Sequence, residues 1–252
     1  MEDVKQIFIN KNAKLGILML HGFSSTPRQF RELSAYLSEK GFNILAPIIA
    51  GHGTTPEDFM KSTSKDWTKS AMDAYLELKK ISEKIIIIGN SFGSDLGLWL
   101  AKELNNEPLG IVTIGAPIFL RFHKLIKIRY FTYGRFRKYY KKPARLYKTD
   151  YTDMVDEVSY PILPVKSIKE LIDFLEKETK SNLPKVKIPI LIASATVDPV
   201  IHPNSVKYIF KNVGSSSKEV FWFDSIRHNI MGMGCDGLFC KIYDFIKKLN
   251  NS

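Results

Sequence analysis

The sequence predicts an α/β fold with a mostly parallel β-sheet that is covered by helices on both faces. Short continuous apolar runs, such as residues 15–20 and 84–88, are typical of strands buried on both sides. Segments with apolar residues at helical spacing separate these runs. The chain has 252 residues, which is near the upper size of a single hydrophobic core. We therefore expect one large domain that carries an insertion.

The first expected strand, residues 15–20, is followed by a well-marked helix. Thr26 is a suitable N-cap, and Pro27 occupies the first helical position. Gln29 would complete a capping box with Thr26. Gly41 ends this helix, so the chain begins with a strand-helix unit.

The remainder of the chain repeats this alternation. Ser167 and Glu170 form a second capping box that begins a later helix. The alternation breaks only between Pro117 and about residue 185, which predicts a core of residues 1–117 and 186–252 and an inserted cap of residues 118–185. The other expected elements are strands at 43–46, 84–88, 110–115, 188–195 and 218–223, and helices around 67–78, 91–104, 167–175, 202–212 and 239–249.

The strongest chemical motif is Gly89-Asn90-Ser91-Phe92-Gly93, which lies between an expected strand and an expected helix. Small residues at both ends of this G-x-S-x-G pattern allow a strained turn that exposes the serine hydroxyl above the sheet. The helix N-terminus behind the serine favours developing negative charge. Ser91 is therefore the candidate nucleophile.

A serine nucleophile needs a histidine base and an acid that orients the base. His228 is the preferred base because it follows the strand at 218–223, and the carboxyl ends of parallel strands share one edge of the sheet. Asp198 is the preferred acid because it follows the strand that ends near residue 195, whereas Asp224 is too close in sequence to His228. The other histidines lie in early turns, in the insertion or at a helix start: His21, His52, His123 and His202.

Acyl transfer also needs two N–H donors for the oxyanion. The first is expected to be the backbone N–H of Phe92, directly after the nucleophile. The second is expected from the turn after the first strand, where Phe23 N–H follows His21-Gly22.

The order Ser91, Asp198, His228 resembles that of the α/β-hydrolase superfamily. Three motifs narrow the resemblance to the bacterial carboxylesterase and monoacylglycerol lipase family: His21-Gly22-Phe23, Gly51-His52-Gly53 after Pro47, and the motif around Ser91. The resemblance implies an α/β-hydrolase fold with a helical cap, residues 118–185, over an acyl pocket. The chain differs from the usual family pattern at Arg227 and Ser94, where glycine is common.

The resemblance also implies the roles of the site residues. Ser91 would attack the ester, His228 would act as base and then as acid, Asp198 would orient His228, and the amides of Phe23 and Phe92 would hold the oxyanion. The implied function is a serine esterase for short- to medium-chain acyl esters and monoacylglycerols, with no metal or organic cofactor. The alternatives are a thioesterase, acyltransferase or lysophospholipase with the same triad, or a hydrolase-fold protein that binds a small ligand without turnover.

The positive charge is concentrated in the expected cap. Of 37 Lys and Arg against 26 Asp and Glu, residues 121–148 contain eleven Lys or Arg and no acidic residue, together with eight aromatics. We interpret this segment as the solvated face of the cap, with an anionic lipid surface as the next alternative. Nucleic acid is not expected as a partner, because the segment directly follows a sheet strand.

Few sequence features concern location and assembly. No apolar run approaches the roughly 18 to 20 residues that span a bilayer, and residues 1–5 lack a signal core. Two cysteines, Cys235 and Cys240, exclude a disulfide framework and make a poor zinc site. We expect a cytoplasmic protein that is a monomer or a homodimer.

Overall fold

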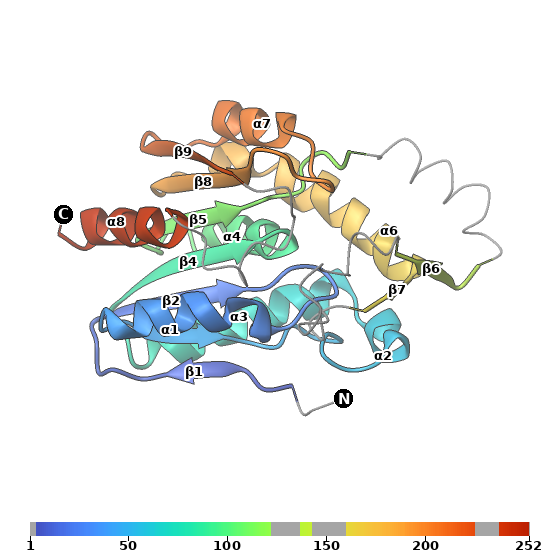
Figure 1. Cartoon of the computed structure of the whole chain (residues 1–252), viewed down its shortest axis with the longest axis horizontal. Helices are drawn as coiled ribbons and strands as arrows, with labels where there is room; N and C mark the ends of the chain where they lie inside the picture. Colours follow the sequence, from blue (N-terminus) through green and yellow to red (C-terminus); the bar gives the residue numbers. More distant parts are fainter. Residues whose placement is uncertain (1–3, 122–136, 143–159, 225–236, 252) are drawn as a thin grey trace.

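The computed structural model describes residues 4–121, 137–142, 160–224 and 237–251 (Figure 1). Its centre is a seven-stranded sheet in the order β1-β3-β2-β4-β5-β8-β9. All neighbouring strands are parallel except β1 (Ile7–Ile9), an unpredicted edge strand antiparallel to β3 (Asn43–Ala46). The predicted α/β-hydrolase fold with a mostly parallel sheet is thereby confirmed. The remaining strands of this sheet are β2 (Leu15–Leu20), β4 (Lys84–Asn90), β5 (Gly110–Ile114), β8 (Ile190–Ala195) and β9 (Lys218–Phe223).

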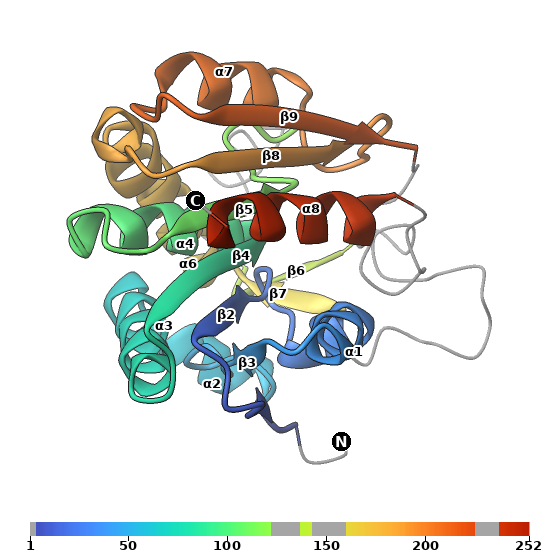
Figure 2. The same ribbon diagram turned by 90° about the vertical axis from the view of Figure 1, so that its left-hand side faces the viewer.

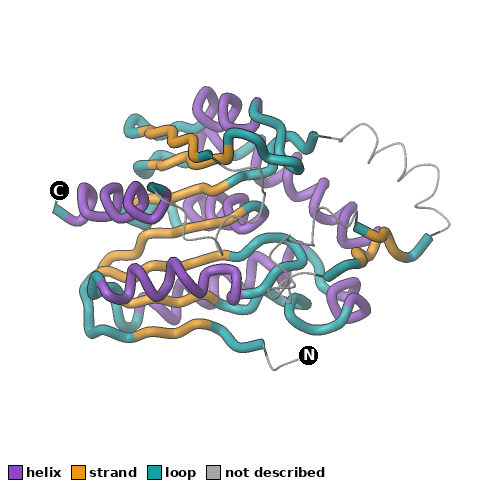
Figure 3. Tube along the Cα trace, in the orientation of Figure 1, coloured by secondary structure: helices purple, strands orange, loops and turns teal. Residues whose placement is uncertain are grey.

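Helices cover both faces of the sheet, as Figures 2 and 3 show. The isoleucines of β4 explain this arrangement, because successive strand residues point to opposite faces. Ile86 and Ile88 belong to one buried cluster, with α1 (Arg31–Glu39) and α8 (Leu238–Asn250). Ile85 and Ile87 belong to the other buried cluster. That second cluster includes residues of α3 (Ser64–Lys79), α4 (Phe92–Glu103), α6 (Val165–Phe174) and α7 (Asn204–Asn212).

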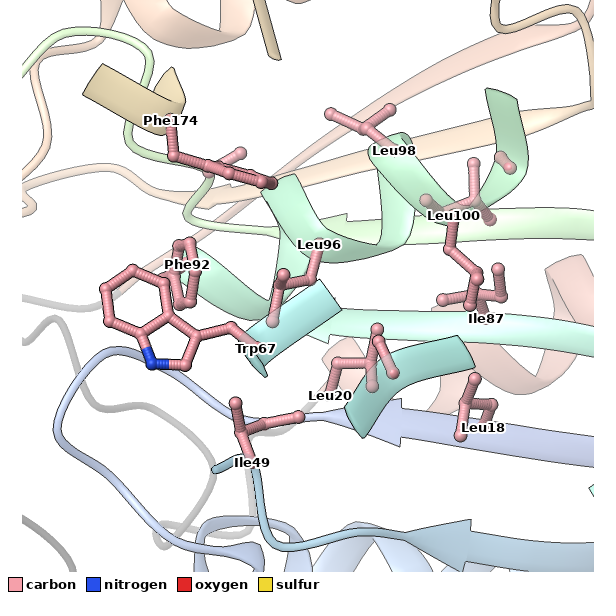
Figure 4. Close-up of a cluster of buried hydrophobic side chains, with 14 of the residues drawn as sticks. Leu18, Leu20, Ile49, Trp67, Ile87, Phe92, Leu96, Leu98, Leu100 and Phe174 are labelled. Atoms are coloured by element: carbon pink, nitrogen blue, oxygen red, sulfur yellow. The ribbon is translucent and has the colours of Figure 1, made fainter. Parts of the chain in front are cut away.

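Aromatic side chains fill the core near the carboxyl ends of β2 and β4. Phe92, at the start of α4, packs edge-on against Trp67 of α3, with ring centroids 5.2 Å apart (Figure 4). Its ring also lies 5.5 Å from that of Phe174, at the end of α6. The residue that follows Ser91 therefore anchors the helix of the insertion to the core.

The described part of the insertion contains strands as well as helix. β6 (Tyr139–Lys141) and β7 (Ile162–Pro164) form an antiparallel ribbon, which Figure 1 shows beyond the carboxyl ends of the sheet strands and beside α2 (Pro56–Lys61). After α6 the chain continues as a π-helical segment, η4 (Leu175–Lys180). The described part of the expected helical cap thus contains a short antiparallel ribbon beside its helix. Most of the basic segment at 121–148 lies outside the described residues, so its role as a cap face or lipid contact stays a prediction.

The first predicted capping box is wrong. Residues Pro27–Phe30 form a 3-10 helix, η1, ahead of α1, and the Thr26 side chain makes no capping hydrogen bond. Gln29 Oε1 instead accepts a hydrogen bond from the backbone N–H of Gly22 at 3.0 Å. The glutamine thus holds the turn after β2 in place.

The second predicted capping box is also wrong. The helix α6 begins at Val165, before Ser167. Glu170 Oε1 accepts hydrogen bonds from Ser64 N at 2.9 Å and Ser64 Oγ at 2.6 Å, so the carboxylate caps α3 across a tertiary contact. In the parts of the chain that the structure describes, no helix is both long and apolar enough to span a membrane.

Candidate active site

Ser91 lies at the sharp turn between β4 and α4. Its backbone has φ 52° and ψ −126°, a conformation that is costly for any residue other than glycine. Ser91 N donates to Ile114 O at 2.7 Å, and Ser91 O accepts from Ser94 N at 2.8 Å, so the surrounding chain maintains this strain. The side chain of Ser91 is half-buried. This is the strained, serine-exposing turn that the G-x-S-x-G motif predicts.

The glycines on either side of Ser91 are required by close backbone contacts. A Cβ atom on Gly89 would lie 2.3 Å from Gly93 O. A Cβ atom on Gly93 would lie 1.8 Å from the carbonyl oxygen of Leu20, the last residue of β2. Because there is no room for a side chain, α4 starts directly against the end of β2.

This close approach places the turn after β2 beside the serine. A Cβ atom on Gly22 would lie 3.3 Å from Ser91 Cβ, so the turn after β2 lies against the nucleophile. The rings of Phe23 and Phe92 are 6.0 Å apart and nearly perpendicular. Within the described residues no acceptor takes the backbone N–H of Phe23 or Phe92, whereas Gly22 N–H is used by Gln29. The amides of Phe23 and Phe92 therefore stay the predicted donors of the oxyanion site.

Asp198 is held on the loop after β8, where it is 3% exposed. Its Oδ1 accepts hydrogen bonds from Val200 N at 2.7 Å and Ile201 N at 2.8 Å. Arg121 Nε donates to the backbone carbonyl of Asp198, and Arg121 N donates to Val200 O at 2.8 Å. A β-bridge between Leu120 and Ile201 adds to these contacts. The start of the insertion therefore fixes the loop that carries the carboxylate.

The rival acid, Asp224, lies in a different environment. It is exposed at the end of β9 and accepts a hydrogen bond from Thr196 Oγ1 at 3.4 Å. A buried carboxylate with a fixed orientation is better suited to orient an imidazole than an exposed one. Of the two candidates Asp198 is the buried and oriented one, and its role as the acid stays a prediction.

Neither early histidine is suited to act as the base. His21 is buried, and its Nε2 accepts from Ile49 N at 3.2 Å, so Nδ1 carries the hydrogen and donates to Gly22 O at 3.0 Å. Burial lowers the pKa of His21 to about 4, although the bond to Gly22 opposes this shift. His52, 5.0 Å from His21 between ring centroids, is also buried, and burial lowers its pKa well below the ordinary value.

The remaining histidines are His202, His123 and His228. His202 is exposed just ahead of α7, and its Nδ1 accepts from Asn204 N at 3.2 Å. His228, Arg227 and His123 lie outside the described residues, so the assignment of His228 stays a prediction.

Ser94 has a structural role that the sequence did not reveal. Its buried hydroxyl donates to Gly89 O at 2.7 Å and accepts from Ile114 N at 3.1 Å. The hydroxyl therefore links the serine turn to β5.

The low pKa of His21 predicts that the protein loses stability in mild acid. The folded form has a pKa of about 4 against 6.5 for the free side chain, so below about pH 6.5 the unfolded chain binds a proton that the folded chain excludes. The free energy of unfolding should therefore fall as the pH falls towards 4, by on the order of 3 kcal/mol from this group. Urea unfolding at a series of pH values measures this change.

The control for this prediction is a pair of variants. The carboxylates contribute equally to the wild type and to His21→Gln, so the difference between their free energies of unfolding at each pH isolates the contribution of His21. The variant His202→Gln replaces an exposed histidine and should keep the wild-type dependence of the free energy of unfolding on pH. If the free energy of unfolding changed equally with pH in His21→Gln and in the wild type, the prediction would be contradicted.

A family model described as serine aminopeptidase, S33 (Hydrolase_4) matches residues 11–232, which is most of the chain. The chain belongs to this α/β-hydrolase family. Among the parts of this family member that the structure describes, no group of three or more His, Cys, Asp or Glu side chains is placed to hold a metal ion.

This hydrolase is similar to characterised bacterial proteins. It is 27% identical over 247 residues to a carboxylesterase of Bacillus subtilis (strain 168), covering 96% of each chain. It is 30% identical over 213 residues to a thermostable monoacylglycerol lipase of Bacillus sp. (strain H-257), covering 84% of this chain and 82% of the lipase. A solved structure from work on LipS and LipT, two metagenome-derived lipolytic enzymes, superposes with a TM-score of 0.88 at 26% identity, covering 98% of this chain and 99% of the other.

Proposed function

We propose that this hydrolase cleaves carboxylic esters through an acyl-enzyme on Ser91. The chain is a carboxylic ester hydrolase by its family and relatives, and the proposal adds the mechanism, the residues and the substrates. The observation that supports it best is the serine turn itself. Ser91 has a positive φ at the N-terminus of α4, beside two backbone amides that no described acceptor occupies.

In the proposed mechanism Ser91 Oγ attacks the ester carbonyl carbon while His228 accepts the hydroxyl proton. The oxyanion of the tetrahedral intermediate accepts hydrogen bonds from the amides of Phe23 and Phe92. His228 then donates its proton to the departing alcohol, and the acyl-enzyme remains. Water, deprotonated by His228, attacks the acyl group and releases the acid and free Ser91. Asp198 orients His228 and stabilises its charged form.

The buried environment of Asp198 supports its role in this mechanism. Two backbone N–H groups hold Oδ1, so the carboxylate has a fixed orientation before substrate binds. Preorganised groups do not have to reorient during the reaction, and this lowers the barrier.

We propose short- to medium-chain acyl esters, including monoacylglycerols, as substrates. Apolar rings pack against one another in the core next to the turn that carries the nucleophile: Phe23, Trp67, Phe92 and Phe174. Of these four only Phe23 is partly exposed, so it is the ring that we propose contacts an acyl chain. The carboxylesterase and monoacylglycerol lipase relatives agree with this substrate class.

A panel of p-nitrophenyl esters of increasing acyl length, with monoacylglycerols alongside, tests the proposed function. We expect saturable hydrolysis and stoichiometric labelling of Ser91 by a fluorophosphonate, located by peptide mass spectrometry. Acyl-CoA thioesters, lysophosphatidylcholine and an added alcohol acceptor, used in parallel, separate the thioesterase, lysophospholipase and acyltransferase alternatives. Ligand binding with neither turnover nor labelling would instead support a protein that binds without catalysis.

A further inference from the structure

Two residues of the insertion contact the turn that follows β2. Lys142 Nζ donates a hydrogen bond to Ser24 Oγ at 2.7 Å. Tyr160 N donates to Ser24 O at 3.3 Å. The pairing of β6 with β7 brings these two residues together, and Lys142 N donates to Pro161 O at 2.9 Å. Both contacts therefore reach the residue directly after Phe23, the proposed oxyanion donor.

The turn that they contact is strained. We call residues 21–25 the oxyanion loop. Ser24 is 1% exposed and has φ 61°, in the left-handed region that is unfavourable for a side chain with a Cβ atom. Such a conformation persists only where its surroundings hold it. Within the loop, Ser25 N donates to Gly22 O at 3.0 Å. The orientation of the Phe23 N–H between Gly22 and Ser24 therefore depends on contacts from outside the loop.

Tyr160 also fixes the neighbouring turn. Its hydroxyl accepts from Thr54 N at 2.7 Å and donates to Gly51 O at 3.2 Å, while its side chain is 7% exposed. That turn carries His52, whose ring centroid is 6.2 Å from that of Phe23. A single tyrosine thus joins the oxyanion loop to the turn packed against it.

The position of Lys142 adds an electrostatic contact to the same region. After burial and the neighbouring His21, the positive charge of Lys142 is a further cause of the low pKa of His52. The charge of Lys142 therefore acts on the imidazole of His52, which packs beside Phe23.

We propose that Lys142 and Tyr160 are positioning residues that hold the oxyanion loop in its active shape. The inference rests on the proposed function, because it assumes that Phe23 N–H binds the oxyanion. The insertion then supports transition-state stabilisation as well as covering the site. A misplaced donor weakens binding of the tetrahedral intermediate more than binding of the substrate.

The variants Lys142→Met and Tyr160→Phe test this inference. The first removes the hydrogen bond to Ser24 Oγ, and the second removes the hydroxyl bonds to Thr54 and Gly51, which hold the turn packed against Phe23, while the bond from Tyr160 N to Ser24 O remains. We expect kcat to fall about 10- to 100-fold while KM changes less than about threefold. An aryl boronic acid, whose adduct with the serine carries a tetrahedral oxygen in the oxyanion position, should lose affinity in parallel with kcat. Lys142→Arg retains the charge and a donor, so it should restore much of the activity.

Two matched controls lie on the same ribbon. Tyr139→Phe removes another hydrogen bond between insertion and core, from Tyr139 to Glu57, without touching the oxyanion loop. Lys141→Met removes an exposed lysine next to Lys142. Both controls should keep wild-type kcat and boronic acid affinity. Wild-type values of both in Lys142→Met and Tyr160→Phe, even with lower thermal stability, would overturn the inference.

Hydrogen exchange separates this inference from the proposed function. Peptides that cover residues 20–29 should exchange faster in Lys142→Met and Tyr160→Phe than in the two controls. If the wild type hydrolysed no ester, the proposed function would fail, and the exchange rates would still decide whether Lys142 and Tyr160 hold the loop. Unchanged exchange in both variants would refute the positioning role.

Discussion

Replacing Ser91 by alanine is expected to abolish ester hydrolysis, with kcat lower by at least about 10⁴-fold. The variant lacks the oxygen that forms the acyl-enzyme, and no other described hydroxyl lies at the serine turn in a comparable exposed position, since that of Ser94 is buried between Gly89 and Ile114. Initial rates on a p-nitrophenyl ester measure the loss.

The fold of Ser91→Ala should remain intact. Alanine keeps the Cβ atom, so the strain at φ 52° is the same in both proteins. Circular dichroism and thermal unfolding check this expectation. Ser38→Ala, on α1 at the opposite face of the sheet, serves as the control and should have wild-type kcat. Substantial activity in a folded Ser91→Ala protein would refute the nucleophile assignment.

Replacing Gly93 by alanine is expected to have the largest effect on stability. The new Cβ atom would lie 1.8 Å from Leu20 O and 2.4 Å from Leu20 C, and these are backbone atoms of a central strand that cannot move aside. We expect a loss of more than about 4 kcal/mol in the free energy of unfolding, or no folded protein. Any folded fraction should be inactive, because α4 and its first amide would be displaced from β2. Urea unfolding measures the effect.

Gly97→Ala is the matched control, since it lies one turn later on α4. Its Cβ atom would meet side-chain methyl carbons instead of backbone atoms, Ile87 Cγ2 at 3.0 Å and Ile111 Cδ1 at 3.1 Å, so a shift of a few tenths of an ångström relieves the contact. Alanine also favours a helix over glycine by about 1 kcal/mol. We expect stability within about 1 kcal/mol of the wild type. If Gly93→Ala and Gly97→Ala had similar free energies of unfolding, the fold would not depend on the close contact between Gly93 and Leu20.

The strand, the strained turn and the helix around Ser91 could be predicted because they depend on local sequence. A run of apolar residues at 84–88 and the G-x-S-x-G motif together specify a strand, a strained turn and a helix, because the glycines leave the backbone few alternatives. The burial of Asp198 likewise agrees with its choice over Asp224. The base, His228, remains a prediction from its place in the sequence.

The features that the sequence did not reveal depend on contacts between distant segments. Glu170 caps a helix that begins at Ser64, and Gln29 binds the turn at Gly22 instead of its own helix. Glu170 and Gln29 both have the spacing of a capping box, but their side chains form hydrogen bonds with distant segments instead. The strands β1, β6 and β7 were not predicted, because a strand of three residues is too short to show an alternation of apolar and polar residues.

The insertion contacts loops of the proposed catalytic site at two described places. At its start, Arg121 and Leu120 bind the segment around Asp198, and further along Lys142 and Tyr160 bind Ser24. We therefore expect that the insertion is not an interchangeable module. A chimera that exchanged it with that of a relative would also have to bring compatible anchor residues, so changes in substrate range through this segment are coupled to changes in catalytic rate.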